Sequence, residues 1–398
     1  MRSGSLTAVV IVAAVLGGAA VLLGAKAGGL LGSGTTTVVV DAQSAVGDAN
    51  APVVAAKPLL GNGFQPAQIY RARAAGVVTV YAAFGSGADG GQGSGFVVSP
   101  AGSILTNAHV VTNAGEAGVL HPARARAVYV QFSDGDRVPA TIVGADLFDD
   151  VAVLHVDPHL HALSPVPLGD SARVVVGQPV AAIGSPFGDT GSLSVGVVSA
   201  IRRSIPSLTT AYDLVDAIQT DAPINHGNSG GPLFDARGRV IGITAQISSS
   251  GGAGSGSEGV GFAVPIDAAR RSLQQLLAAG TVSYAYVGID TEDLTPSIAQ
   301  HFGYAARYGA LISRVVPGSG AARAGLRPAT RTAAFEGLAV PVGGDAIVAI
   351  AGEPVRTAAD VVRIVASRFA PGQTARFTVV NGSRRRTVAV KLGARTVG

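Results

Sequence analysis

A short glycine-rich stretch around Ser229 carries the residues best suited to chemistry. The sequence there reads Gly227-Asn228-Ser229-Gly230-Gly231, with glycines on both sides of the serine. Because glycine accepts backbone angles closed to other residues, this stretch can bend sharply and present an exposed hydroxyl. The same turn can direct successive backbone N–H groups at one point, where they would stabilise an oxyanion. We therefore interpret Ser229 as a candidate nucleophile.

A serine nucleophile needs a base within hydrogen-bond reach and a third group that orients the base. His109 follows an apolar run at 104–106, where a predicted strand gives way to a turn, and is the candidate base. Asp149 and Asp150 compete for the role of orienting carboxylate. Asp150 directly precedes the apolar run 151–154, where the chain enters the core, whereas we expect Asp149 to be exposed. The sequence therefore favours Asp150.

Composition excludes several classes of protein. The 398 residues include no cysteine, which rules out a disulfide framework, a thiolate metal site and a cysteine nucleophile. The net charge of +4 comes mostly from arginine, and no long arginine run is interleaved with aromatic residues. Nucleic-acid binding is therefore disfavoured. The length is enough for two or three folded units.

The N-terminus predicts a membrane helix. After a short tail at 1–5, residues 6–25 are apolar and uncharged, and a helix of this length spans a bilayer core of about 30 Å. A cleaved signal peptide is the alternative, because Ala25-Lys26-Ala27 loosely matches a cleavage site. The length of the run favours an uncleaved anchor with the rest of the chain outside the cytoplasm. Residues 26–66 have the composition of a flexible linker.

From about 67 to 265 the chain consists of short apolar runs separated by glycines, which is typical of a β-barrel or sandwich. A helix is predicted from Ile266 to the glycine at 280, joining a second domain at 281–396. That domain includes a capping box at 357–360 and a hairpin turning at Asn381-Gly382. The predicted strands are 77–80, 95–98, 103–106, 127–132, 151–155, 179–183, 194–201, 240–245 and 259–264.

Several sequence blocks in this order resemble the HtrA/Deg serine proteases. The blocks are Gly93–Phe96, Thr106–Val110, Asp146–Leu154 and Thr220–Leu233. The order His, Asp, Ser along the chain is also that of chymotrypsin-like proteases. The resemblance covers about 67–395 and implies a mainly β fold, with a double β-barrel protease domain at 67–280. It places His109 and Asp150 in the first barrel and Ser229 in the second, and assigns the oxyanion hole to Gly227, Asn228 and Ser229.

The resemblance also implies binding sites for substrate and for a regulatory peptide. It places Ile224 and the strand Ile243-Thr244-Ala245 around the primary specificity pocket, where the absence of an acidic residue suits small aliphatic side chains. It implies that residues 281–396 form a small α+β PDZ domain. The loop Tyr286-Val287-Gly288-Ile289 would receive the C-terminus of a peptide. Relatives assemble as trimers through their protease domains.

Three further features leave alternatives open. His226 stands where the family commonly has Arg or Pro, and can tune the active-site loop or simply face solvent. His155, His159 and His161 lie close together, but no further ligand at suitable spacing supports zinc, so we expect a solvated loop. The loops 203–213 and 248–258 are polar or rich in Gly and Ser, and we expect them to be mobile until something orders them.

The sequence therefore predicts a membrane-anchored, extracytoplasmic serine endopeptidase that needs no metal or organic cofactor. It would degrade misfolded proteins or process a signalling substrate, under control of peptides bound to the PDZ domain. Two alternatives stay open. One is a catalytically silent chaperone or PDZ-based binding protein, and the other is a serine esterase.

Overall fold

The computed structural model describes residues 63–85, 90–114, 122–185, 191–210, 213–225, 227–245 and 259–397. These belong to one compact unit, Pro58–Gly398. The predicted membrane span at 6–25, most of the linker at 26–66, His226 and the loop 248–258 lie outside the described residues. In the part of the chain that is described, no helix is both long enough and apolar enough to cross a membrane.

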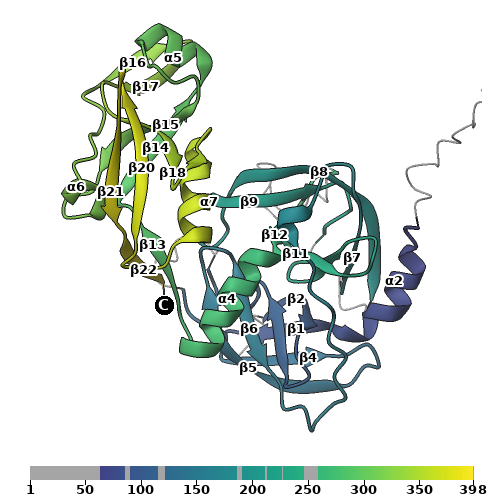
Figure 1. Ribbon diagram of the computed structural model, residues 1–398. Coiled ribbons are helices and arrows are strands. Elements are labelled where there is room, and N and C mark those ends of the chain that lie inside the picture. The colour runs from purple at the N-terminus through teal and green to yellow at the C-terminus, as the bar shows by residue number, and fades with distance from the viewer. Residues whose placement is uncertain are drawn as a thin grey trace, which may run out of the picture. The chain divides into compact units, whose positions relative to one another are not determined.

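Six antiparallel strands form a first closed barrel, in the order β1-β2-β3-β6-β5-β4 (Figure 1). Its interior is filled by apolar side chains, among them Val80, Val97 and Leu154. The strands are β1 (Val77–Ala83), β2 (Gly90–Val97), β3 (Ser103–Thr106), β4 (Ala127–Gln131), β5 (Arg137–Asp146) and β6 (Val151–His155).

A second closed barrel follows, in the order β10-β11-β12-β9-β8-β7. The predicted double barrel is therefore confirmed. The pairing of β8 with β9 shifts register at several points, so this long ribbon bends rather than running flat. The strands are β7 (Pro179–Gly184), β8 (Ser192–Pro206), β9 (Asp213–Thr220), β10 (Pro232–Phe234), β11 (Val240–Ala245) and β12 (Gly261–Pro265).

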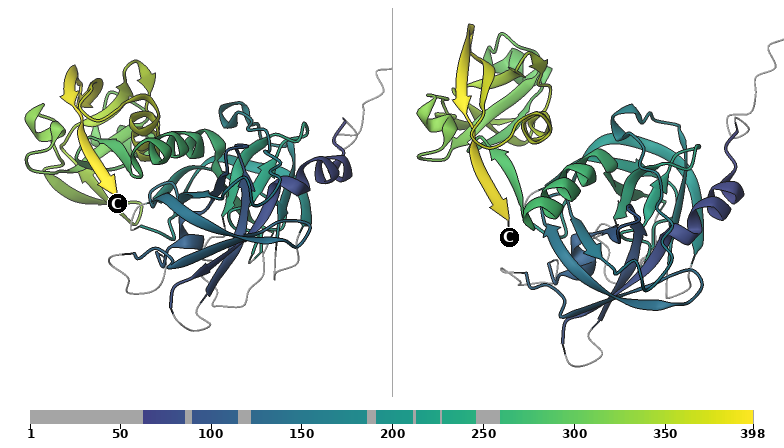
Figure 2. Two further views of the ribbon diagram at one scale, coloured as in Figure 1. Left: turned by 90° about the horizontal axis from the view of Figure 1, so that it is seen from below. Right: turned by 60° about the horizontal axis from the view of Figure 1, so that its bottom comes forward.

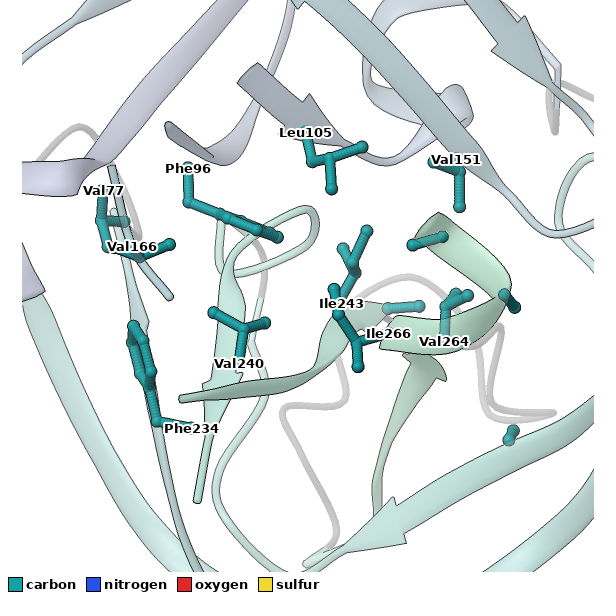
Figure 3. Close-up of a cluster of buried hydrophobic side chains, with 14 of the residues drawn as sticks. Val77, Phe96, Leu105, Val151, Val166, Phe234, Val240, Ile243, Val264 and Ile266 are labelled. Atoms are coloured by element: carbon teal, nitrogen blue, oxygen red, sulfur yellow. The ribbon is translucent and has the colours of Figure 1, made fainter. Parts of the chain in front are cut away.

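The two barrels share one apolar core. Phe96 and Leu105 from the first barrel and Phe234 and Ile243 from the second are all fully buried in the same cluster (Figure 3). Burial of each such side chain contributes about 1.5–3 kcal/mol. This continuous packing holds the two barrels in a fixed position relative to each other.

Helix α4 (Ile266–Ala279) packs against strands of both barrels, including β5 and β11, as the views in Figures 1 and 2 show. The prediction of this helix is confirmed. It ends at Gly280, whose φ of 70° is open mainly to glycine. The other helices of this part are α2 (Pro66–Arg73), η2 (Ala74–Gly76), α3 (Ala108–Val111) and η3 (Ser171–Arg173).

The C-terminal part contains a sheet in the order β14-β15-β18-β20-β21, with β19 paired to β18. The predicted capping box is confirmed at the start of α7, where Thr357 and Asp360 each accept the other's backbone N–H. The predicted hairpin at Asn381-Gly382 is also present. The strands of this sheet are β14 (Ile289–Leu294), β15 (Gly309–Val315), β18 (Ala346–Ile350), β19 (Glu353–Pro354), β20 (Thr374–Asn381) and β21 (Arg384–Lys391).

Two smaller strand pairs and three helices complete this part. The pairs are β13 (Val282–Tyr286) with β22 (Gly393–Val397), and β16 (Arg331–Phe335) with β17 (Leu338–Val342). The helices are α5 (Pro296–Phe302), α6 (Gly320–Arg323) and α7 (Ala358–Arg368).

Some predictions of local structure were wrong. Strands β5, β9 and β10 were missed. The start of the expected loop 203–213 belongs to β8, because residues 203–206 pair with β9. These strands are specified by long-range pairing and by the core they cover, and their own sequences alternate poorly.

Candidate active site

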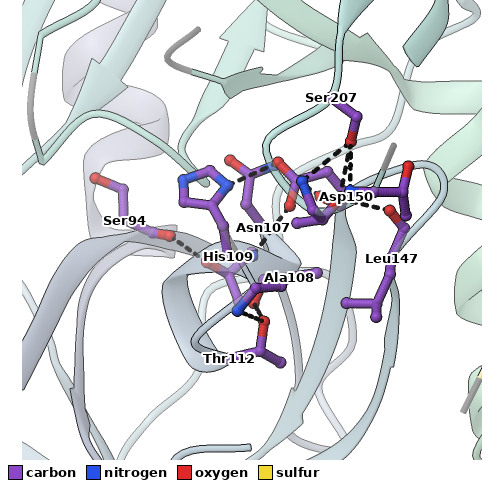
Figure 4. A network of polar contacts seen from close by, with 12 residues as sticks. Ser94, Asn107, Ala108, His109, Thr112, Leu147, Asp150 and Ser207 are labelled. Atoms are coloured by element: carbon purple, nitrogen blue, oxygen red, sulfur yellow. Dashed lines mark hydrogen bonds and ion pairs between the residues drawn. The ribbon is translucent and has the colours of Figure 1, made fainter. Parts of the chain in front are cut away.

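His109 and Asp150 lie in direct contact. The imidazole Nδ1 is 2.7 Å from Asp150 Oδ2, and the backbone N–H of His109 donates to Oδ1 at 3.0 Å (Figure 4). The carboxylate therefore holds both the ring and the backbone of the same residue. A proton on Nδ1 leaves Nε2 free to accept another, which is the tautomer that a general base needs.

Asp150 occupies a turn between β5 and β6 and is 4% exposed. Its φ of 50° lies in the left-handed region, which is uncommon for a residue other than glycine. The side chain of Asn107 donates to the backbone carbonyl of Asp150 at 2.8 Å. Asn107 thereby supports a strained backbone and keeps the carboxylate aimed at His109. The sequence marked Asn107 as part of a block but gave it no role.

Burial and the contact with Asp150 shift the pKa of His109 in opposite directions. Desolvation lowers the pKa of the imidazole, but the charge of Asp150 and its hydrogen bond raise it by more, so the pKa lies above the ordinary 6.5. An imidazole tuned upward in this way is a better proton acceptor. The geometry and the electrostatics both suit a general base.

Ser229 lies on the loop between β9 and β10. Gly227 and Gly230 have φ angles of 94° and 88°, so this loop does make the sharp turn that the glycines indicated. A Cβ on Gly230 would lie 2.4 Å from Thr106 Oγ1 and 3.1 Å from the backbone nitrogen of Asn107. The loop is therefore in close contact with the residues that immediately precede His109.

The expectation of an exposed serine was wrong. Ser229 is 6% exposed, because strand β2 of the first barrel lies directly against its loop. The backbone carbonyl of Ser229 accepts a hydrogen bond from the N–H of Ser94 at 2.7 Å. The Ser229 loop therefore lies against the first barrel, close to the strand end that leads to His109.

The three residues expected to form an oxyanion hole are held by several hydrogen bonds. The Asn228 carbonyl accepts from the Thr244 hydroxyl at 2.6 Å and from the Gly231 N–H at 3.0 Å. The Gly227 carbonyl accepts from the Ser94 hydroxyl at 2.6 Å. Because peptide groups are planar and trans, a fixed carbonyl also fixes the N–H that follows it.

The residues expected around the specificity pocket are all buried. They are Ile224, Ile243, Thr244 and Ala245, none more than 5% exposed. Ile224 lies against Gly261, where a Cβ would come within 2.5 Å of it. The hydroxyl of Thr244 donates to the loop 227–231 around Ser229, which we call the nucleophile loop. All four positions expose little surface.

Comparison with known proteins agrees with this arrangement. Residues 93–243 match the trypsin-like peptidase domain family and residues 285–392 match the PDZ domain family. The solved structure "HtrA-type protease AlgW with tripeptide" is 31% identical, with a TM-score of 0.67, and the match covers 84% of this chain and 98% of that one. The chain belongs to the HtrA family of serine proteases. A serine endoprotease from Yersinia pestis gives a TM-score of 0.57 at 27% identity, over 83% of this chain and 98% of that one.

Curated relatives of this HtrA protein are longer. The "Probable periplasmic serine endoprotease DegP-like" of Halomonas elongata is 39% identical over 301 residues, which are 76% of this chain and 56% of the relative. The protein of the same name from Pseudomonas putida is 37% identical over 302 residues, again 76% and 56%. The chain therefore spans little more than half the length of these relatives.

A cavity of about 440 Å³ lies beside the loop Tyr286-Val287-Gly288-Ile289 of the PDZ domain, and residues of the barrel part, such as Phe148 and Val215, also line it. The carbonyls of Val287 and Gly288 accept hydrogen bonds from the turn at 316–321. The N–H groups of Gly288 and Ile289 consequently face the other way, toward the free edge of β14. An edge strand with outward-facing donors beside a cavity can receive an extended peptide.

A buried acidic cluster lies next to Asp150, and the expectation that Asp149 is exposed was wrong. Its carboxylate is 15% exposed, and Oδ2 lies 4.0 Å from Arg271. Burial, and then the charge of Asp146, raise the pKa of Asp149 to about 7. Asp146 is fully buried and accepts hydrogen bonds from Ser272 on α4 and Tyr284 on β13. The sequence could not show this burial, because it depends on elements more than 100 residues away.

The three histidines at 155–161 differ in their surroundings. In the described ranges no three His, Cys, Asp or Glu side chains are grouped so that they could hold a metal ion. His161 stacks on Phe132 at 3.7 Å and lies 3.0 Å from Asp134. The expectation of a wholly solvated loop was therefore wrong for His161, whereas His155 and His159 are exposed.

Proposed function

We propose that this chain is a serine endopeptidase that acts through Ser229, His109 and Asp150. The observation that carries the proposal is the double contact of Asp150 with His109, at 2.7 Å and 3.0 Å, beside the nucleophile loop. A histidine with only a packing role would need no such hydrogen bond between its Nδ1 and a buried carboxylate. The apolar side chains of Ile224, Ile243 and Ala245, with no acidic residue among them, support cleavage after small aliphatic residues.

The reaction follows from these positions. Ser229 Oγ attacks the substrate carbonyl carbon while His109 Nε2 takes its proton, and the N–H groups of Gly227 and Ser229 stabilise the oxyanion. The peptide C–N bond then breaks and His109 returns the proton to the leaving amine. A water molecule, deprotonated by His109, hydrolyses the acyl-enzyme and frees Ser229. Asp150 keeps the imidazole in position and stabilises its charged form.

The test is digestion of casein by the purified protein beside two variants. Ser229→Ala should lower turnover by at least about 10³-fold, while Ser133→Ala, at an exposed serine, serves as the matched control. A fluorophosphonate probe should label the parent protein and the control but not Ser229→Ala. Equal turnover by all three proteins would remove Ser229 from the mechanism. A peptide left intact while small esters are hydrolysed would favour an esterase, and a lack of both reactions would favour a chaperone.

We further propose that the PDZ domain at 281–396 binds peptide C-termini at Tyr286–Ile289. AlgW has been solved with a tripeptide and with a decapeptide, which supports this class of ligand. Val362 lines the cavity and is 50% exposed. Val362→Glu should weaken binding of a peptide with a free carboxylate, while Leu338→Glu, on an exposed position outside the cavity, should not. A peptide amide bound as tightly as the free acid would contradict carboxylate recognition.

The same proposal places the catalytic domain outside the cytoplasm and anchors it through residues 6–25. The curated relatives are named as periplasmic, which supports the location. The anchor, a protease domain at 67–280 and a trimer rest on the sequence and on the family resemblance. Carbonate extraction of membranes tests the anchor, because an anchored chain stays in the pellet. Light scattering of the detergent-solubilised protein tests the trimer.

A further inference from the structure

Ser94 lies on β2 of the first barrel and contacts the nucleophile loop of the second. The residue is fully buried. Its backbone N–H donates to the carbonyl of Ser229 at 2.7 Å, and its hydroxyl donates to the carbonyl of Gly227 at 2.6 Å. The same hydroxyl accepts the N–H of Ser185 at 2.9 Å. One residue of the first barrel therefore holds both residues that supply the expected oxyanion donors.

Ser94 is held in turn by Thr106, a residue close to His109 in the chain. The Thr106 hydroxyl donates to the Ser94 carbonyl at 2.7 Å, and Thr106 ends the strand from which His109 emerges. Figure 4 shows Ser94 beside His109 and Asn107. Ser94 thus connects the part of the fold that carries the base with the loop that carries the nucleophile.

The hydroxyl of Ser94 restricts the backbone of the loop at Gly227. Thr244 holds the Asn228 carbonyl, and this fixes the direction of the Ser229 N–H. Ser94 holds the Gly227 carbonyl, so the plane that follows Gly227 is also fixed. The direction of the Gly227 N–H then depends on the two backbone rotations of Gly227 itself, ψ about Cα–C and φ about N–Cα, and φ is 94°.

We propose that Ser94 is a positioning residue for the reaction. The Ser94 hydroxyl holds the Gly227 carbonyl and so limits the orientations that the Gly227 N–H can take toward the oxyanion. Ser94 touches no reacting atom and acts through Gly227 and Ser229. The inference rests on the proposed function, since it assigns Ser94 a part in the chemistry of that site.

The experiment compares Ser94→Ala with Thr79→Val in the full-length protein. Thr79 is buried in the same seam, and its hydroxyl donates to Ser185 Oγ without touching the nucleophile loop. Each variant therefore loses one buried hydroxyl from the same region. Ser94→Cys has nearly the volume of serine but is a weak donor, and it replaces the alanine variant if that protein does not fold. Ser94→Thr restores a hydroxyl.

Three readouts are expected to separate positioning from stability. Ser94→Ala and Ser94→Cys should lower kcat for a peptide substrate by at least about tenfold with KM changed less than twofold. Ser94→Thr should recover most of that loss, and Thr79→Val should keep the parent kcat. Amide exchange at Asn228, Gly230 and Gly231, whose N–H groups are hydrogen bonded in the loop, should be faster in Ser94→Ala but not in Thr79→Val.

The outcomes that overturn the proposal are distinct from those that overturn the proposed function. Parent-like kcat in both Ser94→Ala and Ser94→Cys would exclude a positioning role, as would an equal loss in Thr79→Val. If the parent protein shows no turnover at all, the proposed function fails, and amide exchange still decides whether Ser94 orders the loop. Unchanged exchange in Ser94→Ala would then overturn the inference as well.

Discussion

The hydroxyl of Tyr284 lies 2.5 Å from Oδ2 of Asp146 and joins β13 to the turn that leads into Asp150. Asp146 also accepts the backbone N–H of Phe148 at 3.0 Å, so it shapes the turn from within. The first strand after α4 is therefore hydrogen bonded to the segment that supplies the orienting carboxylate. A change in this contact therefore acts on Asp146, which lies four residues before Asp150.

Tyr284→Phe should destabilise the protein. The substitution removes one of the two side-chain donors to a buried carboxylate, at a cost of about 1–3 kcal/mol. In a domain of this size each kcal/mol lowers Tm by about 2–4 °C. Calorimetry of Tyr284→Phe in a Ser229→Ala background, which prevents self-digestion, checks this. Tyr308→Phe, at a half-exposed tyrosine, is the control. Equal Tm values for both variants would show that the contact contributes nothing.

The rate of peptide hydrolysis should rise with pH through a pKa above 6.5. The base must be neutral to accept a proton, and contact with Asp150 raises the pKa of His109, so the rising limb lies at higher pH than for a free imidazole. Asp150→Asn should move this limb to lower pH and reduce kcat by about 10³–10⁴-fold. The measurement is kcat/KM from pH 5 to 9. A limb that moves upward in Asp150→Asn would contradict the assignment.

Asp149→Asn should stabilise the protein at pH 8 by an amount on the order of 4 kcal/mol. The folded-state pKa of about 7 lies above the ordinary 3.8, so the folded carboxyl retains a proton that the unfolded chain has already released. The resulting loss of stability grows as pH rises between these values and is constant above them. An asparagine has no such proton, and its amide can donate to Asp146.

Calorimetry at pH 4 and pH 8, again with Ser229→Ala, measures this difference. The stabilisation should be present at pH 8 and largely absent at pH 4. The exposed Asp136→Asn is the matched control and should show no pH-dependent gain. A gain of the same size at both pH values would mean that ionisation of Asp149 is not its cause.

Gly230→Ala should abolish labelling by a fluorophosphonate. A Cβ there would lie 2.1 Å from the Ser94 carbonyl, and both groups are backbone or close to it, so the nucleophile loop must move. Gly135→Ala is a close control, because its φ of 90° is nearly the same but nothing lies within 4 Å of the new Cβ. The control should lose about 1–2 kcal/mol of stability from the backbone angle alone and keep its labelling. Labelling of Gly230→Ala at the parent rate would contradict the close contact between loop and barrel.

The sequence predicted those parts of the fold that local signals specify. Helix α4 ends at a glycine and α7 begins with a capping box, and both signals are readable within a few residues. Strand β5 was missed, because its ten residues mix polar and apolar side chains in a pattern that the barrel's pairing explains. The hairpin of β16 and β17 was not predicted.

The candidate site divides in the same way. His109, Asp150 and the Ser229 loop are marked by residue type and by neighbouring glycines or apolar runs. The burial of Asp149 depends on Arg271 and Tyr284, and the role inferred for Ser94 depends on a carbonyl in the other barrel. Such contacts between distant segments leave no periodic or compositional signal in one sequence.

The left-handed backbone conformation of Asp150 limits which substitutions this position can accept. Glycine and asparagine adopt that conformation most readily, but neither carries a negative charge. Replacement by either would relax the turn and deprive the imidazole of its counterion. The chain therefore keeps a local conformational penalty that ordinary stabilising substitutions cannot remove, and improvements in robustness must come from positions elsewhere in the fold.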